Sequence, residues 1–128
     1  MNKKIGYTRE TNKTIDELKS VIQQEFKKHG FYSLFDMDMR SLANEKLNQN
    51  FSSYYLMGFY SIPYTYSVTE EDPNINMIMP TNIVLYEIDG KRFISSTEPK
   101  NMDEFKDRVR GLVNIVNNIQ KNVIDTAA

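Results

Sequence analysis

The residues with the clearest capacity for chemistry are tyrosines gathered in one short stretch. Five of the eight tyrosines lie between positions 54 and 66: Tyr54, Tyr55, Tyr60, Tyr64 and Tyr66. A tyrosine combines a large apolar ring with a hydroxyl group, which suits the wall of a ligand pocket and equally a packed core or interface. The stretch therefore has two interpretations, a ligand site or core and dimer packing.

A second candidate is the tripeptide Pro80-Thr81-Asn82, which interrupts the apolar stretch "MIMPTNIVLYEIDG" at residues 77–90. Pro80 has no N–H group and cannot serve inside a central strand, so it marks a strand entrance or a bulge. Thr81 and Asn82 then offer a hydroxyl and an amide that could hold a small polar group, or Asn82 could simply tie down the turn. If the two segments meet, the predicted ligand-binding residues are Tyr54, Tyr60, Tyr64, Pro80, Thr81 and Asn82.

Acid–base or metal chemistry has less support. Asp36 and Asp38, followed by Arg40, alternate onto one strand face and could bind a hard cation or act as an acid–base pair, although such faces are more often solvated. His29, the single histidine, follows a predicted helix and is expected to be structural. The chain has no cysteine, which excludes disulfides, thiolate metal sites and thiol nucleophiles within it. We predict no catalytic residue, no metal and no cofactor.

The length and composition favour one soluble domain covering residues 1–128. Hydrophobic residues make up 40% and charged residues 26%, and 16 basic and 17 acidic side chains leave a net charge of −1. This balance argues against a nucleic-acid partner, which requires a basic face. No segment approaches the roughly 20 apolar residues of a membrane helix, and "MNKKIGYTRE" lacks the apolar core of a signal peptide. We therefore expect no membrane partner and a cytoplasmic location.

Hydrophobic periodicity predicts the elements that must position these residues. The box Thr14-x-x-Glu17 and an apolar stripe predict a helix at 15–26 that ends near Gly30. Strict alternation predicts a strand at 31–39, and Ser41 is expected to cap a short helix to Leu47. Further strands are expected at 5–9, 54–60, 82–88 and 92–96, with a hairpin turn at Asp89-Gly90. Residues 61–73 stay undecided, because they have strand propensity while Pro63 suits the first turn of a helix.

Three segments together resemble the domain of unknown function 302 family. They are "HGFYSLFDMDMRSLANEKL", "YLMGFYSIPYTYSVTEEDPNINMIMPTNIVLYE" and, most specifically within the latter, "DPNINMIMPTNIVLYE". The resemblance covers about residues 5–99. It implies an α+β fold with helices on an antiparallel sheet of four or five strands, a helix at 64–71, and a homodimer. Many relatives carry two cysteines where this chain has Tyr60 and Thr81, so a redox or thiolate role does not transfer.

The C-terminal segment predicts a long helix at 102–124. Its apolar residues recur in steps of three and four, as in a coiled-coil seam: Met102, Phe105, Val109, Leu112, Val116, Ile119 and Val123. Such a helix spans about 33 Å, whereas a seven-residue strand spans about 23 Å. We therefore expect the helix to overhang its sheet and to contact a second chain through Val116, Ile119 and Val123. The alternative is a helix packed wholly on its own domain.

These features favour a non-enzymatic homodimeric module that binds a small, partly apolar ligand beside the tyrosines. A structural interaction protein without a ligand is the first alternative. An enzyme that uses acid–base chemistry at a carboxylate or tyrosine is the second.

Overall fold

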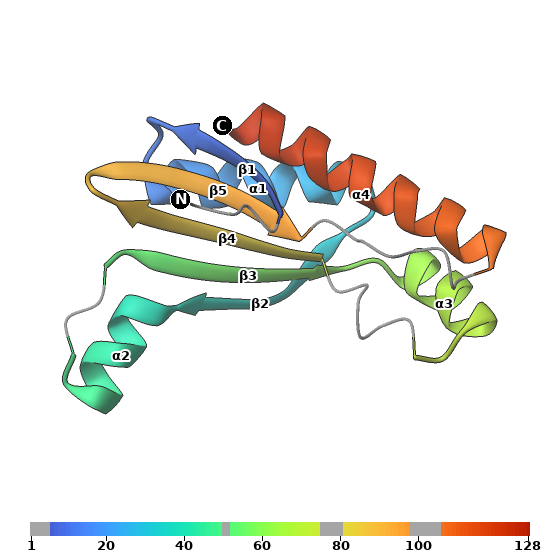
Figure 1. Ribbon diagram of the computed structural model, residues 1–128, viewed down its shortest axis with the longest axis horizontal. Helices are drawn as coiled ribbons and strands as arrows, with labels where there is room; N and C mark the ends of the chain where they lie inside the picture. Colours follow the sequence, from blue (N-terminus) through green and yellow to red (C-terminus); the bar gives the residue numbers. More distant parts are fainter. Residues whose placement is uncertain (1–5, 50–51, 75–80, 98–105) are drawn as a thin grey trace.

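The computed structural model describes residues 6–49, 52–74, 81–97 and 106–128, and these form one antiparallel sheet with helices packed on it (Figure 1). In chain order the elements are β1 (Gly6–Thr11), α1 (Ile15–Lys28), β2 (Tyr32–Asp38), α2 (Met39–Leu47), β3 (Tyr54–Tyr60), α3 (Ile62–Glu71), β4 (Thr81–Ile88), β5 (Lys91–Thr97) and α4 (Asp107–Ala127). The five strands lie in the order β1-β5-β4-β3-β2, and every neighbouring pair is antiparallel. The predicted α+β class, with up to five strands and a long C-terminal helix, is confirmed.

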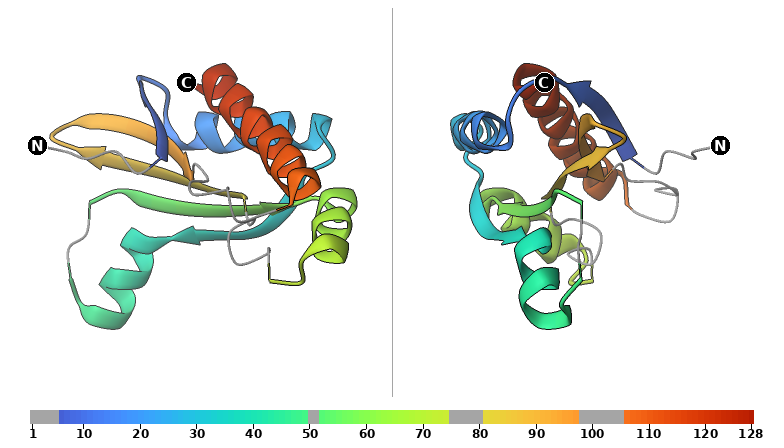
Figure 2. Two further views of the ribbon diagram at one scale, coloured as in Figure 1. Left: turned by 45° about the vertical axis from the view of Figure 1, so that its right-hand side comes forward. Right: turned by 90° about the vertical axis from the view of Figure 1, so that its left-hand side faces the viewer.

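The main core lies between one face of the sheet and the helices α1 and α4. Figure 2 shows these two helices on the same side of the sheet. Alternate residues of each strand point toward them, as the two-residue repeat of a strand requires. The buried residues of this core are Leu18, Ile22, Phe26, Phe31, Met57, Phe59, Ile83, Leu85, Ile94, Val116, Ile119, Val123, Ile124 and Ala127.

Helix α1 begins with the predicted capping box. The Thr14 hydroxyl accepts a hydrogen bond from the Glu17 backbone N–H at 3.1 Å, and the Glu17 carboxylate accepts one from the Thr14 N–H at 3.4 Å. After the helix, Gly30 adopts a φ of 78°, a conformation in which a glycine costs little. Both predicted ends of this helix are confirmed.

A smaller core joins α3 to the first half of α4. Val68 of α3 is buried against Val109 and Val113 of α4, and Figure 1 shows α3 beneath the start of α4. The segment that sequence propensity left undecided is thus helical, as the family resemblance implied. The part of α4 that extends beyond the sheet is covered by α3 of the same chain.

The structure corrects the sequence analysis at β2 and α2. A bulge between Ser33 and Phe35 shifts the register, so Ser33 lies opposite Phe59 but Phe35 lies opposite Gly58. The strict alternation predicted over 31–39 is therefore broken in the middle. The cap of α2 is Asp38 instead of Ser41, because the Ser41 N–H donates to the Asp38 carboxylate at 3.2 Å.

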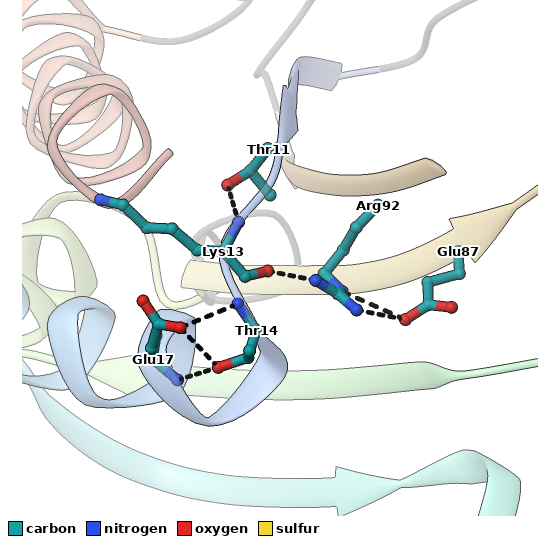
Figure 3. A network of polar contacts seen from close by, with 6 residues as sticks. All are labelled: Thr11, Lys13, Thr14, Glu17, Glu87 and Arg92. Atoms are coloured by element: carbon teal, nitrogen blue, oxygen red, sulfur yellow. Dashed lines mark hydrogen bonds and ion pairs between the residues drawn. The ribbon is translucent and has the colours of Figure 1, made fainter. Parts of the chain in front are cut away.

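Arg92 ties the β4–β5 hairpin to the turn between β1 and α1 (Figure 3). Its guanidinium donates to the Glu87 carboxylate at 2.8 and 3.1 Å and also to the Lys13 carbonyl. The hairpin turn has positive φ angles at Asp89 (53°) and Gly90 (76°), which confirms the predicted turn. The final helix runs from Asp107 to Ala127 and is preceded by an extended Lys106, so it does not run unbroken from 102 as predicted; residues 102–105 lie outside the described residues.

Candidate functional site

The sheet face turned away from α1 and α4 carries large apolar side chains, and we call it the open face. In Figure 1 this face is toward the viewer, with α1 behind the sheet. Strand register places Tyr54, Tyr86 and Phe93 in one row, and Leu56 with Val84 in the next. All its large side chains are half-buried or exposed: Tyr32, Phe35, Met37, Tyr54, Leu56, Tyr60, Val84, Tyr86 and Phe93.

Aromatic rings occupy both ends of the open face. At one end the rings of Tyr54, Tyr86 and Phe93 form a row, with centroid separations of 6.4 Å and 5.3 Å. At the other end Tyr32 and Tyr60 have ring centroids 6.3 Å apart. Such contacts stabilise neighbouring strands beyond the burial of their area.

The predicted ligand-binding residues are divided between the two faces of the sheet. Tyr54 and Tyr60 lie on the open face but at opposite ends of β3, about 20 Å apart at the rise of a strand. Asn82 lies on the same face, opposite Gly58. Thr81 is buried on the helix-covered face opposite Phe59.

The other two predicted residues lie elsewhere. Tyr64 is in α3, where its ring stacks on Phe31 of the core with centroids 5.7 Å apart. Pro80 lies outside the described residues. The structure thus brings Tyr60 and Asn82 to one end of the open face and separates Thr81 and Tyr64 from them.

A hollow that the sequence analysis missed lies on the exposed side of α3. It has a volume of about 470 Å³ and is lined by Ile62, Thr65, Tyr66, Thr69 and Glu70. These residues recur in steps of three and four along the helix. The signal was hidden because the segment's strand propensity left its periodicity undecided.

The polar groups considered for acid–base chemistry have structural partners. Asp38 caps α2, and Asp36 pairs with Lys19 of α1 at 3.6 Å. Lys19 also donates to the Tyr55 hydroxyl at 2.7 Å. Burial raises the pKa of Tyr55, and the hydrogen bond to Tyr55 raises the pKa of Lys19. Both shifts move the pKa values of these groups further above neutral pH, whereas a general base needs a pKa near the working pH.

Metal-binding clusters and membrane-spanning helices are both missing from the described segments. Within them, no group of three or more histidine, cysteine, aspartate or glutamate side chains could hold a metal ion. None of the helices in that part of the chain combines the length and apolar character needed to cross a bilayer.

The residues expected to contact a second chain are buried in their own protomer. The exposed fractions of Val116, Ile119 and Val123 are 2%, 8% and 1%, and all three belong to the core beneath α4. A dimer contact through these side chains would require α4 to leave the sheet.

The fold and its open face define a small α+β protein with a one-sided antiparallel sheet, and comparison with known proteins identifies its family. A family model described as "Domain of unknown function DUF302" matches residues 7–127, so the chain belongs to this family. It is also similar to a crystal structure of an uncharacterised conserved DUF302 protein from Bacillus stearothermophilus. That similarity has a TM-score of 0.87 and 15% sequence identity over 97% of this chain and 98% of the other. No curated protein matches the chain.

Proposed function

We propose that this protein is a non-enzymatic homodimeric module whose open face contacts a second copy and holds a small, partly apolar ligand at one end. The observation that carries the proposal is the row of large apolar side chains on a sheet face turned away from α1 and α4. Contiguous apolar surface of this kind is typical of interaction sites.

The size of the open face suits a dimer. Five strands spaced about 4.8 Å apart and about seven residues long make a face of roughly 24 Å by 24 Å, or about 570 Å² before side-chain relief is counted. Each partner in a standard protein–protein interface buries about 800 Å². A second copy that covers this face would therefore bury an area close to the lower limit of that class, about 600 Å² per partner.

The edges of the sheet are less suited to pairing with another chain. The bulge between Ser33 and Phe35 interrupts the ladder of the edge strand β2. The opposite edge strand, β1, exposes the charged residues Arg9 and Glu10. Bulges and charges are the usual features that keep an edge strand from adding a partner strand, so the face is the better candidate.

The ligand is assigned to the end of the open face that carries Tyr32, Tyr60 and Asn82. The Asn82 Oδ1 atom is buried and has no hydrogen-bond partner among the described residues, although buried polar atoms are normally paired. An amide at the same end of the face as two tyrosine rings suits a molecule with one polar group and an apolar body. This end of the face keeps two of the predicted ligand-binding residues together.

Light scattering tests the dimer. The parent protein should have a molar mass twice the 15.0 kDa of the chain. Leu56→Glu should reduce the molar mass to that of a single chain, because a charge would be desolvated at the centre of the interface. Met37→Lys, at a position already 36% exposed, repeats the test where folding is not at risk. Asn44→Glu on exposed α2 is the control. A parent that is monomeric, or variants that stay dimeric, would contradict the proposal.

Native mass spectrometry of protein purified from its own host tests the ligand. The parent should carry an added mass that Asn82→Ala removes while the protein stays dimeric. A dimer that never carries an added mass would instead support the alternative of an interaction protein without a ligand.

A further inference from the structure

Two buried polar side chains on the helix-covered face have oxygens without a partner in the described part of the chain. The exposed fractions of Ser96 in β5 and Gln120 in α4 are 3% and 4%. The Ser96 hydroxyl oxygen and the Gln120 carbonyl oxygen are buried with no hydrogen-bond partner among the described residues. Native proteins pair about nine in ten such groups with protein or ordered water, so an unpaired group calls for an explanation.

Strand register and packing place Ser96 beneath the turns of α4 that carry Gln120. Ser96 lies opposite Tyr7 in β1, and α4 lies over that tyrosine: Lys121 is 5.5 Å from the ring, and Asp125 accepts from its hydroxyl at 2.5 Å. Gln120 directly precedes Lys121 and points inward. The Gln120 side chain is therefore expected to face Ser96 across the core.

The surroundings of this pair are apolar. Ile83, the cross-strand partner of Ser96, and Ile94, two residues before it, belong to the same core as Val116 and Val123 on either side of Gln120. A third orphaned acceptor, the Oδ1 atom of Asn117, lies one turn earlier on the same side of α4. We therefore expect the three oxygens that the described residues leave unpaired to lie close together, as a polar island within a hydrophobic core.

We propose that this island is a binding site for a small neutral hydrogen-bond donor, with a water molecule as its resident occupant. The two amide oxygens accept hydrogen bonds, and the serine hydroxyl can accept or donate. A water molecule with two to four such partners is a normal structural component of a protein interior. The charged groups beside Tyr7, Lys121 and Asp125, contact that tyrosine, and Asp125 also pairs with Arg9, so the island favours a neutral occupant over an ion.

The site is independent of the proposed function, because it lies on the opposite side of the sheet from the open face. Asn117, which is half-buried, lies at the side of the island nearest to solvent. A molecule larger than water that offers the same donors would enter past this residue.

Thermal melting of variants tests the proposal. Gln120→Leu keeps the size of the side chain and removes its hydrogen bonds, and Ser96→Ala removes the hydroxyl. If an occupant bridges them, each variant should melt about 3–6 °C lower, and the double variant should lose less than the two losses added together. Gln24→Leu, at an exposed position of α1, is the control for replacing glutamine by leucine in a helix.

Two results would overturn the proposal. One is a Gln120→Leu protein that melts at or above the parent temperature, since an unpaired and unoccupied amide is improved by an apolar replacement. The other is a folded parent that shows neither NMR cross-peaks between a long-lived water and the Gln120 side-chain amide nor, in native mass spectrometry, an added mass that Gln120→Leu removes. An added mass without the cross-peaks would identify the occupant as a small organic donor at the same site.

Discussion

The ring of Phe35 in β2 lies directly over the backbone of Gly58 in β3. The two residues are opposite each other in the register, and a Cβ atom added to Gly58 would collide with three ring carbons of Phe35. The bulge between Ser33 and Phe35 brings the ring to this position. Gly58 therefore allows the two strands to pack closely. This role accounts for a glycine inside β3, where glycine otherwise weakens a strand.

Gly58→Ala should destabilise the protein by about 1–3 kcal/mol, because the added methyl group forces the Phe35 ring out of its place. Gly111→Ala is the matched control. Gly111 lies on the exposed side of α4, where a methyl group would meet open space among the described residues, so alanine there should stabilise by about 1 kcal/mol. Chemical denaturation measures both. Equal stability of the two variants would show that Phe35 does not rest on Gly58.

Stability at acidic pH should depend on Asp125. The hydrogen bond from Tyr7, followed by that from Arg9, lowers the pKa of this carboxyl below its ordinary value. A lowered folded-state pKa contributes stability above the ordinary value of about 3.9 and loses it as the pH falls through the folded-state value. Asp125→Asn should thus melt below the parent at pH 6, and the difference should shrink as the pH falls below about 3.9.

A companion effect is expected at alkaline pH. The hydrogen bond to Asp125 raises the pKa of Tyr7. The stability linked to this raised pKa is fully present below the ordinary value of about 10 and is lost as the pH rises through the folded-state value. Tyr7→Phe should remove this alkaline loss. A difference between parent and Asp125→Asn that is independent of pH would contradict the linkage.

Replacing two isoleucines of α4 distinguishes a role in core packing from a role in a dimer contact. Ile119 is 8% exposed and Ile115 is 46% exposed. Ile119→Ala should cost about 2–5 kcal/mol, whereas Ile115→Ala should change stability by no more than about 0.5 kcal/mol. If Ile119 instead contacted a second chain, its replacement would lower the molar mass in light scattering and leave the melting of the monomer unchanged.

Metal chelators should leave the melting temperature unchanged. The chain has no cysteine and one histidine, and the two strand carboxylates considered as cation ligands are engaged: Asp36 by Lys19 and Asp38 by the cap of α2. Calorimetry with and without EDTA measures this. A loss of stability that a single metal restores would show that other side chains form a metal site.

Signals from neighbouring residues predicted most elements well. Features that depend on contacts between distant residues could not be predicted from the sequence. The capping box at Thr14 and the turn at Asp89-Gly90 depend on neighbours a few residues away, so the sequence carries them directly. The bulge between Ser33 and Phe35 depends on how Phe35 packs on Gly58 of another strand, and the alternating pattern of residues 31–39 does not predict it. Helix α3 was reached through the family resemblance, because its own residues favour a strand.

The candidate site illustrates the same limit. Residue types alone single out the tyrosine stretch and Pro80-Thr81-Asn82 as sources of aromatic rings and an amide, but they do not say which face each side chain occupies. One position along a strand reverses the side on which a residue lies, and so Thr81 is buried under the helices while Asn82 lies on the open face. The sequence predicted that the distal residues Val116, Ile119 and Val123 extend beyond the sheet, but these lie in the main core, and the first half of α4 packs on α3 instead.

Because β1 pairs with β5, which comes much later in the chain, the pairing affects the order in which the elements can fold during synthesis. Gly6 pairs with Thr97, and Tyr7 meets Asp125 of α4. A chain leaving the ribosome therefore carries its first strand without a partner until some ninety residues have followed. The hairpin of β4 and β5 can close early, because its strands are neighbours in sequence. Docking of β1, and then of α4 over it, is expected to complete folding late, as long-range pairings form slowly.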